Sequence, residues 1–388
     1  MLGKTLPQQE FERLCHCLRI QPGSSHIPAL RSELLVSGFS KLVKLAMDLR
    51  LEAALASALL EKQLLPPIPK FALADGRTTI TKSVDDILAA HQTRRAAMAE
   101  RLVEIVAVLN QAGIFPTLIK GARSLWSGAP KWRSLLDLDM VVMGDEARRA
   151  QALVQGMGYA PIKRHYVDIV KHHLPELFRP DLPGWVEIHS QISVRFAETL
   201  IPTPNLVNRA DFVSLGTNAQ AGVLRPADHV LQGMVHHHFH HAEFRNRGWL
   251  DIKGLYEFTA EVTRLNVSER TELLSRASAH PRLLAALDLW LAAASNLFDC
   301  PIEPPFNLYP DAAMRWTKAL RRMTGEEKSL AFYPGHAEEI ALCFNRERLE
   351  RTNTSKSFVG LGLGRLKVLA SLANNSYPNT IALPRLWP

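Results

Sequence analysis

The spacing of apolar residues predicts a helical region over residues 1–82. Leu42, Leu45 and Leu49 recur at three- and four-residue intervals, which places their side chains on one face of an amphipathic helix. The sequence LLPPIP follows, and proline cannot continue a helix. The helical pattern therefore ends before a second zone of different character.

The second zone, residues 83–200, predicts an α/β core. A long helix is expected from Ser83, a residue type suited to the N-cap, to Gly113, a residue type suited to the C-terminal stop. GARSLW and GDEARRAQALVQGMG predict two further helices. Four short apolar segments predict strands: FPTLIK, LLDLDMVV, YVDIVKHHL and GWVEIHSQIS. This order of helices and strands is typical of a small unit with a mixed sheet.

The third zone, residues 201–388, is predicted to be mainly helical. Its expected helices are PADHVLQGMVHHHFHH, WLDIKGLYEFTAEV, VSERTELLSRASAH and PRLLAALDLWLAAASNLF. GLGLG at 360–364 does not follow a predicted strand, so we interpret it as structural and not as a dinucleotide-binding fingerprint. The three zones together predict an α+β protein whose mixed-sheet core is flanked by N- and C-terminal helical domains.

Composition adds a preference for anionic partners. The 388 residues are 47% apolar and 22% charged, which is ordinary for a soluble globular protein, and carry a formal charge of +8. This excess suits a nucleotide, a nucleic acid or a phosphorylated substrate without requiring one. The four cysteines form no CxxC pair, and no apolar run is long enough to cross a bilayer. These features, with no signal-peptide pattern at the N-terminus, predict a cytoplasmic protein without a membrane partner.

Two carboxylates stand one residue apart in the predicted strand LLDLDMVV. Because alternate side chains of a strand face the same side, Asp137 and Asp139 project together. Burying an unpartnered charge costs several kcal/mol, and a shared divalent cation would remove the repulsion between them. Carboxylate oxygens suit Mg²⁺, and two ions about 3.5–4 Å apart can assist a phosphoryl displacement. The alternative is a solvated strand edge, where an Asp-x-Asp pair is common.

A third carboxylate lies on the predicted strand GWVEIHSQI. Glu187 shares a face with Trp185 and His189, whereas Val186 and Ile188 face the other way. We expect Glu187 to lie beside the aspartate pair, as a metal ligand or as the base that activates an acceptor. His189 is then expected to support the site or to contact substrate.

The strand–turn–helix segment LIKGA suits phosphate binding. Gly121 allows close approach of a ligand to the backbone, and the N-terminus of the following helix favours anions. Lys120 and Arg123 add positive charge. Alternatively, Lys120 is a surface residue at a strand end, and Arg133 forms a structural pair with Asp137.

These segments together resemble the DNA polymerase β-like nucleotidyltransferase superfamily. More narrowly, the chain resembles a bacterial group of uncharacterised nucleotidyltransferases, whose hallmark is Lys-Gly followed by an arginine, three residues and Asp-x-Asp. Lys120, Gly121 and Arg133 match the first part, and Asp137 and Asp139 match the second. VEIHSQI and the segments HHHFHH and WLDIKGL match that group's later elements.

The resemblance implies a polymerase β-like core that moves a nucleoside monophosphate from a nucleoside triphosphate, for example ATP, to an acceptor, releasing pyrophosphate. It implies Mg²⁺, with two ions expected, held by the catalytic residues Asp137, Asp139 and Glu187. The implied nucleotide-binding residues are Lys120, Gly121, Ala122, Arg123 and Arg133, with Ala122 at a position where the superfamily usually has serine. The acceptor stays open between a small molecule, a peptide, a protein and RNA.

A histidine cluster offers a rival interpretation. His237 and His241 share one face of a predicted helix, as do His236 and His240, and Asp251 follows downstream. They could form the zinc or iron site of a phosphohydrolase. Alternatively, His237 and His241 line the acceptor side of the cleft without holding a metal. A third interpretation is a catalytically silent module that binds nucleotide.

Overall fold

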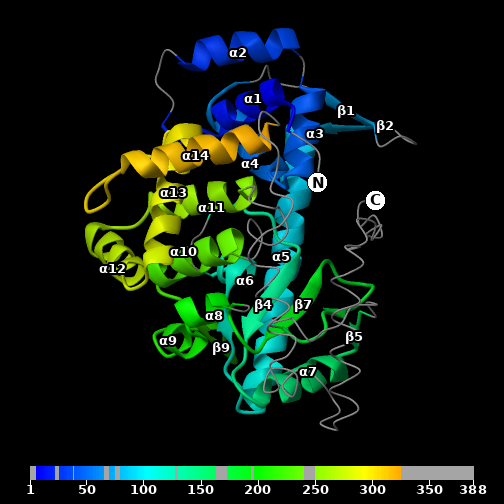
Figure 1. Cartoon of the computed structure of the whole chain (residues 1–388). Coiled ribbons are helices and arrows are strands. Elements are labelled where there is room, and N and C mark those ends of the chain that lie inside the picture. Colours follow the sequence, from blue (N-terminus) through cyan, green and yellow to red (C-terminus); the bar gives the residue numbers. More distant parts are fainter. Residues whose placement is uncertain are drawn as a thin grey trace, which may run out of the picture.

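The computed structural model describes most of the chain up to residue 324. The described residues are 6–21, 26–37, 39–64, 70–74, 79–126, 130–162, 173–193, 196–239 and 250–324. Most of the predicted strand YVDIVKHHL, the GLGLG segment, His240 and His241 lie outside these ranges. The described residues form the predicted α+β fold, with a mixed sheet and several layers of helices (Figure 1).

The central sheet has seven strands in the order β5-β6-β7-β4-β3-β9-β8. Strand β4 runs parallel to β7, and β3 runs parallel to β9, whereas the other neighbouring pairs are antiparallel. The strands are β3 (Thr117–Leu118), β4 (Asp137–Val141), β5 (Ala160–Pro161), β6 (Leu177–Phe178), β7 (Trp185–His189), β8 (Asp211–Gly216) and β9 (Ala219–Val223). Since β8 and β9 follow residue 200, the sheet continues into the zone that was predicted to be mainly helical.

One face of the sheet is covered by the long helix α5 (Val84–Gln111) and by α7 (Glu146–Gly156). Both helices were predicted from the sequence, and α5 matches the expected 83–113 helix closely. Leu138 and Met140 of β4 and Ile188 of β7 are buried in one cluster with residues of α5. Because strand side chains alternate, Asp139 and Glu187 must face the opposite side of the sheet.

The N-terminal region contains four helices and a hairpin. The elements are α1 (Gln8–Leu18), α2 (His26–Ser37), α3 (Ser40–Asp48), α4 (Glu52–Glu61), β1 (Lys70–Ala74) and β2 (Thr79–Ser83). The continuous apolar spacing of this region covers two helices, α3 and α4, because Arg50 between them adopts a left-handed conformation (φ 58°). The β1–β2 hairpin was not predicted.

The C-terminal helices include the four segments that the sequence predicted. They are α10 (Pro226–Val235), α11 (Ile252–Val262), α12 (Val267–Ser278) and α13 (Pro281–Phe298), followed by α14 (Pro310–Met323). Three short helices, α6 (Lys120–Arg123), α8 (Phe196–Leu200) and α9 (Thr203–Val207), adjoin the sheet. Every helix in the described part of the chain is too short or too polar to span a membrane.

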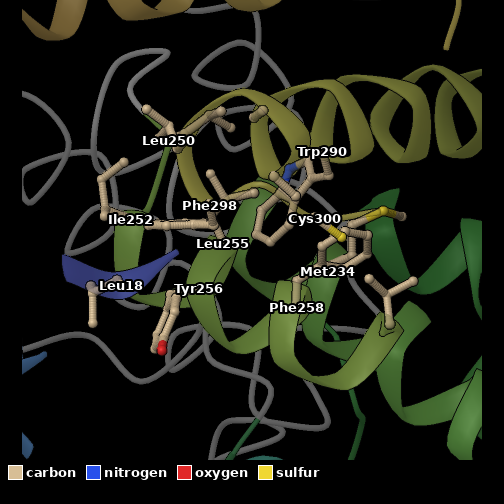
Figure 2. Close-up of a cluster of buried hydrophobic side chains, with 14 of the residues drawn as sticks. Leu18, Met234, Leu250, Ile252, Leu255, Tyr256, Phe258, Trp290, Phe298 and Cys300 are labelled. Atoms are coloured by element: carbon tan, nitrogen blue, oxygen red, sulfur yellow. The ribbon is translucent and has the colours of Figure 1, made fainter. Parts of the chain in front are cut away.

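The N- and C-terminal helices share one hydrophobic core. Leu18 of α1 lies in the same buried cluster as Tyr256 and Phe258 of α11 and Trp290 of α13 (Figure 2). The backbone also links the two regions, since the Ile20 amide donates to the Phe298 carbonyl at 2.8 Å. The helices that flank the sheet therefore stabilise each other as one body.

Candidate active site

The register of β4 against β7 sets the geometry of the carboxylates. Asp139 lies directly opposite Glu187, and Asp137 lies opposite Trp185. The structure thereby brings Asp139, Glu187 and His189 together: one potential ligand atom of each lies within 4.8 Å of the others. Asp137 is near them in the same strand but is not a member of this three-residue group.

Asp139 is fully buried and only partly satisfied. Its Oδ1 accepts hydrogen bonds from Lys120 Nζ at 2.7 Å and from His189 Nε2 at 2.8 Å. Burial raises the pKa of Asp139, but Lys120 and His189 together lower it below its ordinary value, so the carboxylate is ionised. Its Oδ2 is buried without a hydrogen-bond partner among the described residues. An ionised, buried oxygen without a partner fits a site that receives a cation.

Asp137 differs from Asp139, although both belong to one motif. It is partly buried, and its carboxylate makes no hydrogen bond or ion pair with another described residue. Burial and the nearby charges of Asp139 and Glu187 raise the pKa of Asp137 well above its ordinary value. Its negative charge is therefore poorly compensated, and a bound cation would relieve this repulsion.

Glu187 connects the aspartates to a second group of donors. Burial raises the pKa of Glu187, but the hydrogen bond from His189 and the charges of His173 and Lys120 lower it well below its ordinary range. His173 Nε2 lies 3.9 Å from Glu187 Oε2, and His173, Glu176 and Glu187 form a second set of ligand atoms within 4.8 Å of one another. Sequence reasoning missed His173 and Glu176. They come close to Glu187 because His173 pairs with His189 across the sheet, and this pairing has no local signal in the sequence.

The Lys-Gly turn is shaped by close packing. Lys120 has a left-handed backbone (φ 46°), and Gly121 begins the buried part of α6. A Cβ atom added at Gly121 would lie 2.6 Å from Leu135 Cδ2, so any larger residue here would displace the buried Leu135 side chain. Ala122 is fully buried beside it. The turn therefore holds Lys120 at the carboxylates instead of leaving it on the surface.

The two arginines expected near the nucleotide are engaged by other groups. Arg123 is buried, and its Nε donates to the Leu224 carbonyl at 3.0 Å. Arg133 Nη2 lies 2.9 Å from Glu257 Oε2, and its Nη1 lies 3.3 Å from His229 Nε2. Arg133 thus pairs with a carboxylate of α11, and not with Asp137 as the structural alternative proposed.

The histidines that follow α10 have partners within the protein. His237 Nδ1 donates to Asp251 Oδ2 at 2.8 Å, and His238 Nδ1 accepts from Trp290 Nε1 at 3.1 Å. Among the described residues, neither group of three convergent metal donors includes His236, His237 or His238. The described part of this cluster therefore resembles a packed polar network between helices.

The fold and site together define a class of protein. A mixed sheet that presents an Asp-x-Asp pair and a glutamate on neighbouring parallel strands, beside a Lys-Gly turn, matches the nucleotidyltransferase pattern inferred from the sequence. The chain belongs to the family described as uncharacterised nucleotidyltransferases, whose model matches residues 37–298. This match confirms the resemblance. No curated protein shows a significant match to the chain.

Proposed function

We propose that the protein transfers a nucleoside monophosphate from a nucleoside triphosphate to an acceptor in a Mg²⁺-dependent reaction that releases pyrophosphate. The observation that supports this most directly is the unpartnered, buried Oδ2 of Asp139, opposite Glu187 and two residues from the unpaired Asp137. Family membership supports the same class of reaction.

The donor set fits the expected cation. Asp137, Asp139 and Glu187 would hold Mg²⁺, which prefers carboxylate oxygens and completes its coordination with water and substrate phosphate. When bound, the cation would neutralise charge on the triphosphate. His189 and Lys120 fix the orientation of the Asp139 carboxylate through Oδ1 and leave Oδ2 available.

Glu187 has two candidate roles that kinetics can separate. As a base, it would take the proton from the acceptor, and Glu187→Gln would lower kcat far more than it raises KM for the nucleotide. As a metal ligand, it would support both steps, and nucleotide binding and transfer would fall together. Its position opposite Asp139 favours the ligand role.

The decisive test combines binding with labelling. Purified protein is titrated with each nucleoside triphosphate in Mg²⁺ and in EDTA, then incubated with α-labelled nucleotide, Mg²⁺ and cell extract. We expect Mg²⁺-dependent binding and the appearance of a labelled acceptor, both lost in Asp139→Asn. Binding without labelling would favour the silent nucleotide-binding module. Folded protein that binds no nucleotide in Mg²⁺ would refute the proposal.

A further inference from the structure

Arg94 on α5 has a buried donor edge without a partner. Its Nε and Nη2 atoms are inaccessible to solvent and make no hydrogen bond within the described residues. These two atoms form the side of the guanidinium that binds a planar or tetrahedral oxyanion through two parallel hydrogen bonds. Arg179 shows this geometry in the same structure, since its Nε and Nη2 hold the two oxygens of Asp181 at 2.9 and 3.1 Å.

Leaving such an edge unpartnered is costly. Each buried donor of a charged group loses its hydration without gaining a protein acceptor. The part of α5 that carries Arg94 is also held in place by hydrogen bonds of the neighbouring side chains. Arg95 donates to the carbonyls of Arg133 and Ser124, and His91 Nε2 contacts the Lys131 carbonyl at 2.9 Å. An unsatisfied donor pair on a well-anchored helix indicates a missing acceptor.

The anchors on α5 direct Arg94 toward the ends of the two strands that carry the site. His91 and Met98 are three and four residues away from Arg94 on the helix, so all three share a face. His91 contacts the loop that leads into β4, and Met98 packs beside Gly184, the residue before β7. Arg94 therefore faces the ends of β4 and β7, where Asp137 begins its strand.

The charges around Arg94 agree with this placement. Burial lowers the pKa of Arg94, whereas the carboxylates of Asp137 and Glu52 raise it, so both carboxylates lie close enough to interact. Glu52 is the first residue of α4, and burial raises its own pKa, which weakens negative charge on that side. Electrostatic interactions thus link the guanidinium both to Glu52 of α4 and to the first aspartate of the motif.

The cations that the sequence offered for phosphate binding already have partners. Lys120 pairs with Asp139, Arg123 with the Leu224 carbonyl, and Arg133 with Glu257. Arg94 instead has an unpartnered fork near the end of β4, where the proposed cation ligand Asp137 begins its strand. An oxyanion linked to that cation would satisfy the fork and the metal at once.

We propose that the Nε/Nη2 edge of Arg94 binds a phosphate group of the nucleotide's polyphosphate chain, next to Asp137. This inference rests on the proposed function and names a binding residue that neither the motif nor the family pattern includes. Because Asp137 and Glu52 are acidic, we expect phosphate binding at Arg94 to require Mg²⁺.

The test compares three variants by calorimetric titration with Mg²⁺–nucleoside triphosphate and with Mg²⁺–tripolyphosphate. Arg94→Lys keeps the charge and removes the fork, and Arg94→Gln removes both. Arg101→Lys, on the same helix in an exposed pair with Glu104, is the matched control. Thermal unfolding of each variant establishes that it is folded.

We expect Arg94→Lys to lower the binding affinity for both ligands by about tenfold, and Arg94→Gln to lower it further. Arg101→Lys should bind both ligands as tightly as the wild type. Tripolyphosphate separates the phosphate contact from recognition of the base. Wild-type binding of both ligands with unchanged affinity in Arg94→Lys and Arg94→Gln would overturn the assignment of Arg94 and leave the proposed function intact. Wild-type protein that binds neither ligand would overturn both.

Discussion

Two regions of the molecule combine buried histidines with carboxylates, and they differ in how their polar atoms are arranged. On the sheet, Asp139 Oδ2 is buried without a partner in the described structure, and Asp137 makes no ion pair there. At the end of α10, His237 pairs with Asp251, and His238 accepts from Trp290. Residue types alone therefore do not distinguish a ligand site from a structural network, whereas the convergence of donor atoms does: among the described residues, the groups of metal donors form only at the sheet.

The secondary structure explains the difference. In paired parallel strands, alternate residues of both strands face one side, so Asp139, Glu187 and His189 converge. Successive residues of a helix point in different directions, so His237 and His238 reach different partners on α11 and α13. His237 also packs tightly on Gly254, where an added Cβ would collide with the imidazole ring.

The largest effect is expected from Asp139→Asn, which removes a buried charge from the site on the sheet. The asparagine amide is neutral and cannot compensate the charge of Lys120. The ion pair that is lost is buried, since the Asp139 side chain is 1% exposed. Breaking a buried pair typically costs about 3–5 kcal/mol, and we expect a loss of about 3 kcal/mol here because Glu187 still attracts Lys120. Nucleotide transfer should fall about 100-fold or more. Urea unfolding and the labelling assay measure the two effects.

The double variant Lys120→Met/Asp139→Asn separates these effects. It removes the stranded charge, so stability should recover in part while transfer stays low. If the double variant is no more stable than Asp139→Asn, the Lys120–Asp139 pair does not account for the loss.

The next effect concerns pH and the histidine region. Burial, with Arg282 and Arg315 nearby, lowers the pKa of His238 from 6.5 to about 4. As pH falls, His238 is therefore protonated in the unfolded chain before it is protonated in the folded protein. The folded protein loses stability as pH falls from 6.5 toward about 4. This difference corresponds to about 3 kcal/mol at the acid end.

Replacing His238 with glutamine tests this contribution. The Gln carbonyl can still accept from Trp290 Nε1, but the side chain does not titrate. Unfolding free energies measured from pH 7 to pH 4 should fall less steeply in the variant than in the wild type. Parallel curves for the two proteins would rule out the contribution of His238.

A smaller effect is expected from His237→Ala, which changes the histidine region and leaves the residues of the sheet unchanged. It removes the hydrogen bond to Asp251 and leaves a gap against Gly254, so stability should fall by about 2 kcal/mol. Mg²⁺-dependent nucleotide binding should match the wild type. Asp251→Asn is a matched control, because asparagine retains the N-cap of α11 but lacks the charge. Loss of metal-dependent binding in His237→Ala would contradict the contrast between the regions.

Local patterns in the sequence predicted the elements that carry the site but not their pairing. Alternation in LLDLDMVV and GWVEIHSQI is sufficient to place Asp137, Asp139 and Glu187 on strand faces. The register that sets Asp139 opposite Glu187 depends on contacts between segments almost fifty residues apart along the chain, which alternation does not encode. The same limit hid His173 and Glu176, and the pairing of Lys120 with Asp139.

Other features were missed because their local signal points elsewhere. Strand β8 is an edge strand whose residues are mostly exposed, so its side chains lack the usual alternation. Arg94 occupies a helix rich in charged residues, where an arginine ordinarily indicates a solvated face. Its burial follows from the packing of the N-terminal helices around α5, which only the tertiary structure shows.

The smallest effect on stability is expected from Asp137→Asn. The Asp137 carboxylate makes no ion pair within the described residues, and its pKa is raised above 3.8, so its ionisation destabilises the folded protein as pH rises above that value. In EDTA at pH 7 the variant should be more stable than the wild type, and the gain should disappear as pH falls below 3.8, where the carboxyl is protonated in the folded and the unfolded protein. Adding Mg²⁺ should reverse the order, because the wild type gains binding energy that the variant loses. Urea unfolding with and without Mg²⁺ measures both signs. A variant that is less stable than the wild type in EDTA would show that Asp137 stabilises the fold as Asp139 does, and would contradict the raised pKa of Asp137.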